Sequence, residues 1–180
     1  MRRVIEYALV SADGVFEDPV AMGVGQHQDQ AYLRDGLGLL LSCDAILFGR
    51  RTYKAFADLY QGGDHKPMWA DRLTTMPKYV FSSTLEQADW SNSVIVRGDV
   101  VAEVTRLKQQ DGGNLLVLGH GQLGETLLRE RITDLIDLTV YPFLAGHGRL
   151  FFREGQRAAL RLVASKTFSS IVKLTYELEK

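Results

Sequence analysis

One glycine, two arginines and one threonine stand together between an apolar run and a run with helical spacing: Gly49, Arg50, Arg51 and Thr52. The glycine lets the backbone turn tightly, and Thr52 can cap a helix whose first N–H groups form an anion site. Two guanidinium groups at this point can donate paired hydrogen bonds to a phosphate. The pattern predicts a docking point for the 2′-phosphate that distinguishes NADPH from NADH. A capped helix with two solvated arginines is the alternative interpretation.

A second glycine-rich segment follows an apolar run and opens a run with helical spacing: Gly119, His120, Gly121, Gln122, Leu123 and Gly124. It matches G-x-G-x-x-G, in which glycines let a pyrophosphate approach the backbone at a helix N-terminus. A Rossmann domain carries this motif in its first βα turn, whereas here it falls late in the chain. We therefore interpret it as a phosphate-binding turn outside a Rossmann fold. The alternatives are a tight turn that needs glycine for its backbone alone, and a surface position for His120.

Two hydroxyl side chains, Ser82 and Ser83, end the strand-like segment KYVFSS. Open α/β sheets bind ligands at the carboxyl ends of their strands. Strand-terminal serines are common, so this pair alone indicates little. Three predicted strand ends nevertheless carry arginine, hydroxyl and glycine, and their convergence favours one binding cleft.

Three carboxylates are candidates for work on a substrate. Asp13, in the segment SADG after the first predicted strand, can orient a polar substrate or hold a turn. Asp29 and Asp35 lie on a predicted helix, where a buried carboxylate facing a cleft can act as a proton donor. Asp29 is the candidate catalytic acid, and a solvated helix surface is the alternative for both.

The overall charge and composition exclude several classes of partner. The chain has 180 residues, 46% of them hydrophobic, and a formal charge of −1, which is the balance of an ordinary globular domain. This charge gives no electrostatic reason to bind nucleic acid or an anionic membrane. No apolar run reaches the length of a transmembrane helix, and the N-terminus lacks a signal-peptide cleavage site. We expect a small-molecule substrate and neither a nucleic-acid nor a membrane partner.

The cysteine and histidine content points to a reducing compartment without a metal site. Cys43 is the only cysteine and lies in an apolar run, so we predict a buried thiol and a cytoplasmic location. The histidines are dispersed and show no metal-ligand spacing, so no metal is expected. They are His27, His65, His120 and His147.

Apolar runs and helical spacings alternate along the chain. They predict one α/β domain over 1–180, with a mostly parallel sheet of about eight strands and a C-terminal antiparallel hairpin. The predicted strands are 3–10, 44–49, 78–83, 93–98, 114–119, 134–144 and the hairpin 160–178. Helices are predicted over 27–42, 52–60 and 69–73, after a cap at Asp99, and after the GHGQ turn.

Five segments occur in the order found in the dihydrofolate reductase-like superfamily: VSADG, DAILFGRRTY, KYVFSS, NLLVLGHGQLGETLL and DLTVYPFLAGHGRLFF. The chain most resembles the reductase domain at the C-terminus of bifunctional riboflavin-biosynthesis enzymes, together with its stand-alone bacterial relatives. The resemblance covers nearly the whole chain. It implies a dihydrofolate reductase-like three-layer fold with NADPH across the sheet, and often a homodimer.

The resemblance also implies roles for individual residues. The segment from Gly49 to Thr52 would meet the adenosine phosphate end of NADPH, and Ser82 and Ser83 would lie along the same half. The pyrophosphate would be cradled by Gly119, Gly121, Gln122 and Leu123. Ala8 and Val10 would approach the nicotinamide, and Asp13 would face the substrate.

Two departures from the family pattern concern the substrate side. Riboflavin reductases have a basic residue where this chain has Val15, and an acidic residue where it has Leu135. Such losses discriminate strongly between substrates. We therefore expect hydride transfer from NADPH to a C=N or C=O bond of a small polar heterocycle, resembling 5-amino-6-(5-phosphoribosylamino)uracil reductase. The alternatives are a catalytically silent NADPH-binding or regulatory dimer, a dihydrofolate reductase-like enzyme with another substrate, and a purely structural protein.

Overall fold

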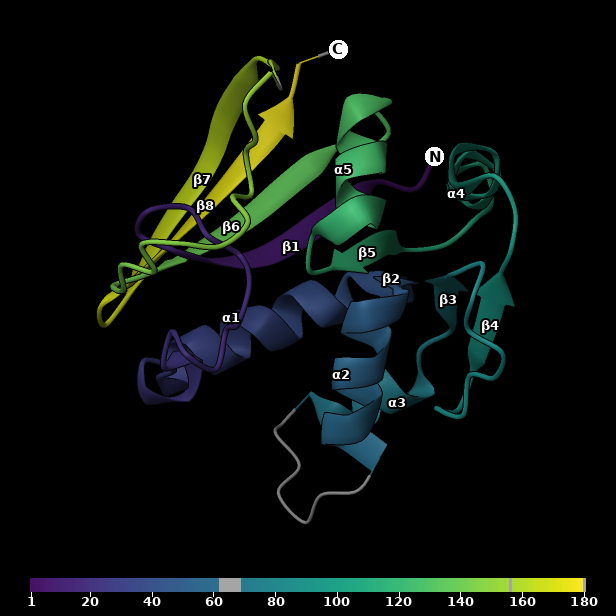
Figure 1. The fold of residues 1–180 in the computed structure, drawn as a ribbon, viewed down its shortest axis with the longest axis horizontal. Coiled ribbons are helices and arrows are strands. Elements are labelled where there is room, and N and C mark those ends of the chain that lie inside the picture. Colours follow the sequence, from purple (N-terminus) through teal and green to yellow (C-terminus); the bar gives the residue numbers. More distant parts are fainter. Residues whose placement is uncertain (62–68, 156, 180) are drawn as a thin grey trace.

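Eight strands form one sheet in the computed structural model, which describes residues 1–61, 69–155 and 157–179. The strands follow the order β4-β3-β2-β5-β1-β6-β8-β7 across the sheet (Figure 1). All pairings from β4 to β6 are parallel, whereas β8 runs antiparallel to both β6 and β7. The strands are β1 (Val4–Ser11), β2 (Cys43–Gly49), β3 (Lys78–Phe81), β4 (Ser93–Val96), β5 (Asn114–Leu118), β6 (Leu135–Tyr141), β7 (Leu160–Phe168) and β8 (Ile171–Leu178).

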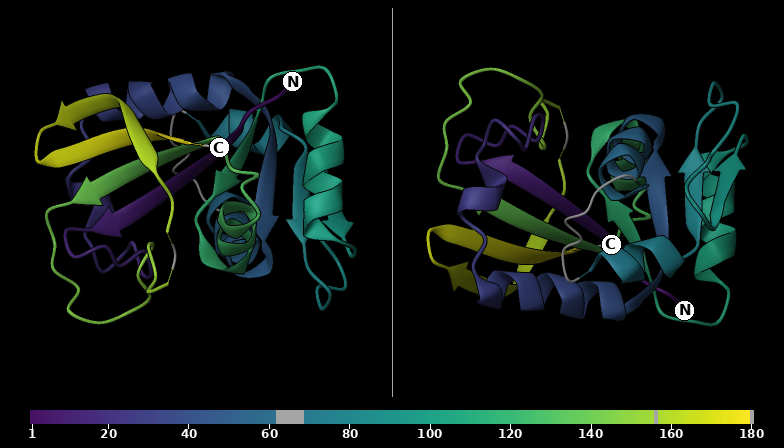
Figure 2. Two further views of the ribbon diagram at one scale, coloured as in Figure 1. Left: turned by 90° about the horizontal axis from the view of Figure 1, so that it is seen from above. Right: turned by 90° about the horizontal axis from the view of Figure 1, so that it is seen from below.

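Helices cover both faces of the sheet. One side carries α1 (Gln30–Leu41), α2 (Arg50–Gln61) and α3 (Ala70–Thr75), and the other carries α4 (Val100–Lys108) and α5 (Gly121–Arg129) (Figure 1). A short 3₁₀ helix, η1 (Val24–Gln26), precedes α1. Viewed from above, the hairpin β7–β8 and the strands β3 and β4 lie at opposite ends of the sheet (Figure 2). No helix in the described part of the chain is both long and apolar enough to cross a membrane.

The core consists of two layers because successive strand side chains point to opposite faces. In β5, Leu116 and Leu118 pack toward α1, α2 and α3, while Leu115 and Val117 pack toward α4 and α5. This burial on both faces explains why the central strands read as continuous apolar runs.

The predicted fold class is confirmed, including the C-terminal hairpin. Asp99 caps α4 as predicted, because its Oδ1 accepts hydrogen bonds from the N–H groups of Val101 and Ala102 at 2.8 and 3.2 Å. The last parallel strand ends at Tyr141, three residues earlier than expected, where Pro142 has no N–H to continue a ladder. The predicted loop after α2 falls mostly on residues 62–68, which lie outside the described residues, as does His65.

Candidate active site

A cavity of about 720 Å³ lies against β1 and β5, on the sheet face that α1, α2 and α3 cover. Its floor includes Tyr7 and Leu9 of β1 and Leu116 and Leu118 of β5. Helix side chains and the segment before α1 form the walls. A volume of this size suits a small-molecule site.

Three tyrosine hydroxyls form a chain at one end of this cavity. The Oη atoms of Tyr7 and Tyr32 lie 2.5 Å apart, and the hydroxyl of Tyr141 donates to Tyr32 Oη at 3.2 Å. Gln28 Nε2 is 3.5 Å from Tyr141 Oη. Burial raises the pKa of both Tyr7 and Tyr32 above the ordinary tyrosine value. The two hydroxyls are therefore neutral hydrogen-bonding groups.

The side chains of Ala8 and Val10 do not line the cavity. Both are buried in the cluster around Phe151, on the opposite face of β1. Tyr7 and Leu9 face the cavity instead. Because successive side chains of a strand point to opposite faces, the side chains of Ala8 and Val10 lie on the face away from the cavity. Their approach to the nicotinamide stays a prediction.

The two predicted phosphate segments meet at the carboxyl ends of β2 and β5. A Cβ on Gly119 would lie 3.2 Å from Thr52 Oγ1, and a Cβ on Gly49 would lie 3.8 Å from Leu123 Cβ. Gly119 and Gly121 have φ angles of 74° and 61°, which side chains disfavour. Nothing lies within 4 Å of a Cβ placed on Gly121. The turn therefore leaves its backbone open at the N-terminus of α5, where an anion binds well.

Both arginines of the first segment stand on the surface at the start of α2. Arg50 and Arg51 are exposed, and neither forms a hydrogen bond or ion pair with the described residues. The predicted capping role of Thr52 is wrong: α2 already begins at Arg50, so Thr52 lies in its first turn. Its side chain instead packs against Gly119. The guanidinium groups are free to bind an anion.

The predicted serine pair follows β3 at the same end of the sheet. Ser82 Oγ accepts hydrogen bonds from the N–H groups of Thr84 and Leu85 at 3.2 and 2.9 Å, which forms a local turn. The Ser83 carbonyl accepts from Arg97 at 3.1 Å, and the Leu85 carbonyl accepts from the same guanidinium at 2.6 Å. Arg97 thus brings a third exposed cation to this edge, although its donors serve the loop.

A buried pair beneath the glycine turn was missed by sequence reasoning. Glu6 Oε1 lies 2.5 Å from His120 Nδ1, and both side chains are fully buried. The rings of Phe16 and Phe151 pack against the imidazole at centroid distances of 5.2 and 4.3 Å. His120 is therefore an internal anchor of the turn, and the surface position expected for it is wrong. Glu6, the one charge within an apolar run, was the available signal.

The third glycine of the motif makes room for this pair. A Cβ on Gly124 would overlap Glu6 Oε1 and would lie 2.6 Å from His120 Nδ1. Gly124 is itself buried within α5. Glycine at this position is therefore explained by the packing of the Glu6–His120 pair, without any role in binding a ligand.

Asp13 holds a loop in place. Its carboxylate accepts hydrogen bonds from Ser11 Oγ at 2.5 Å and from the N–H groups of Ala145 and Gly146 at 3.0 and 2.8 Å. The bond from Ser11, followed by the two backbone donors, lowers the pKa of Asp13 to about 2. Asp13 is not among the described residues that line the cavity. The structure favours the turn-holding alternative over contact with substrate.

Asp29 and Asp35 also have structural partners. Asp29 Oδ1 accepts from the Tyr32 N–H at 2.7 Å and caps α1. Asp35 binds Lys173 Nζ at 2.6 Å and also contacts Lys166, which ties α1 to the hairpin. Neither aspartate lines the cavity within the described residues. Asp29 serves as a helix cap here, and nothing in the geometry gives it a role in proton donation.

The two departures noted in the sequence are accommodated by packing. Val15 is buried, and its Cγ1 would lie 2.6 Å from a Cβ on Gly148. Leu135, at the first position of β6, packs against the core cluster on the α1 side. Among the described residues, neither lines the cavity.

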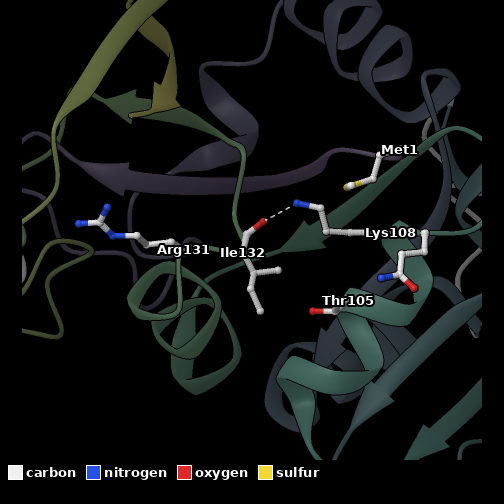
Figure 3. Close-up of a pocket in the computed structure, with 6 residues that line it drawn as sticks. Met1, Thr105, Lys108, Arg131 and Ile132 are labelled. Atoms are coloured by element: carbon white, nitrogen blue, oxygen red, sulfur yellow. Dashed lines mark hydrogen bonds between the residues drawn. The ribbon is translucent and has the colours of Figure 1, made fainter. Parts of the chain in front are cut away.

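A smaller cavity of about 180 Å³ lies between the C-terminal ends of α4 and α5 (Figure 3). Its ammonium group, Lys108 Nζ, is engaged by the Ile132 carbonyl at 3.0 Å and by Asp134 Oδ2 at 2.5 Å. The Arg131 side chain points away from Lys108, Ile132 and Thr105 (Figure 3). The lysine ammonium of this cavity is therefore already engaged by described residues. Among all the residues that the structure describes, no group of three or more His, Cys, Asp or Glu side chains could hold a metal ion.

Both a sequence relative and solved structures are similar to this chain over nearly its whole length. The Bacillus subtilis protein YyaP, described as uncharacterized, is 27% identical over 97% of this chain and 94% of its own length. A putative riboflavin biosynthesis protein from Shewanella sp. PV-4 superposes with a TM-score of 0.77 at 20% identity and covers 99% of both chains. RibD from Acinetobacter baumannii superposes with a TM-score of 0.71 at 13% identity, over the whole of this chain and 59% of RibD.

The two structural likenesses establish the fold. The sequence model of the RibD C-terminal domain family, in turn, matches residues 2–174, which is nearly the whole chain. Its span includes the glycine turns, the free arginines and the strands that floor the cavity. The chain therefore belongs to the RibD C-terminal domain family.

Proposed function

We propose that this protein is an NADPH-dependent reductase acting on a C=N or C=O bond of a small heterocyclic substrate. Membership of the RibD C-terminal domain family supports a reductase. The observation that carries the proposal is the meeting of two glycine turns and two free arginines beside a 720 Å³ cavity. Leu118 lines the cavity, and the turn follows it directly.

The residues present fit a phosphorylated dinucleotide. The open backbone at Gly121 and the α5 N-terminus suit a pyrophosphate. Arg50 and Arg51 have no described partner and suit the 2′-phosphate, since guanidinium binds phosphate bidentately. Ser82 and Ser83 extend the same edge of the sheet. When bound, NADPH supplies a hydride, which is the difficult part of the chemistry.

The chain itself would orient the substrate and exclude water. The apolar walls of the cavity displace solvent from a bound ring. The hydroxyls of Tyr7 and Tyr32 hold protons at Oη, and the one whose proton does not lie in their mutual hydrogen bond can donate to a heteroatom of the substrate. The geometry supports these tyrosines better than Asp13 or Asp29 as the polar groups that meet it.

A catalytically silent NADPH-binding protein is the second candidate. The observation that favours it is that Asp13 and Asp29, the two candidate acids, are both engaged by backbone N–H groups. Such a protein would bind NADPH without consuming it.

Calorimetric titration of the purified protein with NADPH and with NADH tests the proposal. We expect NADPH to bind more tightly, followed by substrate-dependent loss of absorbance at 340 nm in a panel of cyclic imines and ketones. Binding without consumption across the panel would favour the silent protein. Absence of binding by well-folded protein would reject both candidates.

We further propose a homodimer formed through the edge of the sheet. The outer edge of β7 has no strand partner among the described residues, and Leu162 and Val163 on it are 52% and 42% exposed. Unpaired strand edges invite pairing with another chain. Light scattering should give a molar mass of two chains for the wild type and of one chain for Val163→Lys.

The cytoplasmic location stays a prediction from the single cysteine.

A further inference from the structure

We infer that the 720 Å³ cavity accepts an uncharged, largely apolar ring compound and excludes phosphorylated substrates. The inference rests on the proposed function only in taking this cavity as the substrate site. It revises the expected polar substrate and departs from a phosphoribosylated pyrimidine. Its basis is the chemistry of the cavity wall and of the charged groups behind it.

The wall consists mainly of hydrocarbon. Leu39 and Leu40 of α1, Phe56 and Leu59 of α2, and Trp69 face the cavity together with the leucines of the floor. Trp69 donates its indole N–H to Tyr60 Oη at 2.9 Å, so this polar group of the wall is already satisfied. Flat aromatic and apolar surfaces of this kind favour planar rings.

Among the described residues that line the cavity, none carries a charged side chain. One cation close to the wall is Lys173, whose Nζ lies 5.7 Å from the centroid of the Tyr7 ring. Two carboxylates hold it: Asp35 Oδ2 at 2.6 Å and Asp137 Oδ2 at 2.8 Å. Its charge is therefore already paired. With respect to the described residues, a phosphate in this cavity would be desolvated without a free cation in the lining to compensate.

The polar end of the cavity suits one neutral acceptor. The hydroxyls of Tyr7, Tyr32 and Tyr141 are joined by two hydrogen bonds. One of their three O–H protons is therefore not donated to another of these tyrosines. That proton can be donated to a carbonyl oxygen or a ring nitrogen. Tyr7 and Tyr32 both line the cavity, which places this donor at its wall.

A pair of probes that differ by one phosphate tests the exclusion. 1-Naphthol and 1-naphthyl phosphate are titrated calorimetrically into the full chain, with and without NADP⁺. We expect 1-naphthol to bind at least about tenfold more tightly, because the ester must bury an uncompensated charge. Equal or tighter binding of the phosphate ester would overturn the inference, and so would failure of both probes to bind.

A matched pair of lysine variants places the effect in the cavity. Leu59 lines the cavity mouth and is 64% exposed, so Leu59→Lys should fold normally and bring a cation to the site. We expect it to raise affinity for 1-naphthyl phosphate by about two- to fivefold. Leu41→Lys, at a 63% exposed leucine of α1 that does not line the cavity, is the control and should change nothing. Equal effects of both variants would overturn the assignment to this cavity.

A second pair of probe compounds tests the hydroxyl donor. 1-Tetralone has one carbonyl acceptor and tetralin has none. Tyr32→Phe should weaken binding of 1-tetralone about fivefold and leave tetralin unchanged, whereas Tyr176→Phe should affect neither. An unchanged affinity for 1-tetralone would overturn the donor role. Failure of NADPH to bind would reject the proposed function alone, because all four probe compounds report on the cavity without the cofactor.

Discussion

The turns at the carboxyl ends of β2 and β5 and the neighbouring cavity differ in the charged groups that they present. At the carboxyl ends of β2 and β5 the backbone is open, and Arg50 and Arg51 are exposed without a described partner. Beside this end of the sheet, the described residues that line the cavity include no charged side chain, and Lys173 is held by two carboxylates. The contrast supports the proposal that a phosphate of the cofactor would bind at the carboxyl ends of β2 and β5, while the cavity would select by shape and by neutral hydrogen bonds.

The turn itself depends on a buried pair, and disturbing that pair should have the largest effect. Gly124→Ala would drive a Cβ into Glu6 and His120 and should cost about 3 kcal/mol or more of unfolding free energy. Urea denaturation measures this. Gly38→Ala is the control, because nothing lies within 4 Å of a Cβ there and alanine favours the helix. Similar stability of the two variants would show that the pair does not fix the turn.

The tyrosine chain should matter less for stability. Tyr32→Phe removes the hydroxyl between Tyr7 and Tyr141 and should cost about 1–3 kcal/mol, because buried partners lose a hydrogen bond. Tyr176→Phe, at a half-buried tyrosine with no hydrogen bond to described residues, should cost much less. The difference in urea midpoint between the two variants measures how much the linked tyrosine hydroxyls stabilise the fold. No difference would mean that the hydrogen bonds among these hydroxyls do not stabilise it.

Asp13, which holds the loop at Ala145 and Gly146, should give the smallest effect, one that depends on pH. Its folded pKa of about 2 lies below the ordinary value of 3.8. The carboxylate therefore stabilises the fold above pH 3.8, and this contribution disappears as the pH falls through 2. Asp13→Asn should be less stable than wild type at pH 7, by a difference that shrinks toward pH 2.

The control for this pH dependence is Asp58→Asn, at an exposed position without a hydrogen bond to the described residues. Its difference from wild type should be small at both pH values. A constant deficit of Asp13→Asn at every pH would contradict the loop-holding role, since it would not follow ionisation.

The fold was predictable because its signals are local. Apolar runs marked the strands, Asp99 marked a helix start, and alternation on either side of a polar break marked the hairpin. The face of β1 was not predictable, because a strand buried on both sides shows no alternation that separates Tyr7 from Ala8. The sequence therefore indicated the strand correctly but did not indicate which of its side chains line the cavity.

The geometry of the candidate site was predictable where it consists of backbone turns and exposed charges. The glycine segments were recognisable from composition, and the structure brings them together through Thr52 and Gly119. The Glu6–His120 pair was not, because its members are 114 residues apart and their contact exists only in the folded sheet. The partners of Asp13 and Asp29 were not predictable either, because they include backbone N–H groups that a sequence does not display.

The most direct test of the account is the change in NADPH preference when the free arginines are removed. Calorimetric titrations of Arg50→Ala and Arg51→Ala with NADPH and NADH would be compared with Lys54→Ala, an exposed cation one turn along α2. We predict that at least one arginine variant loses about 1–3 kcal/mol of NADPH binding, while NADH binding and the Lys54 variant stay unchanged. Equal affinities for NADPH and NADH in the wild type, or no loss in either arginine variant, would contradict phosphate recognition at the strand-end turns.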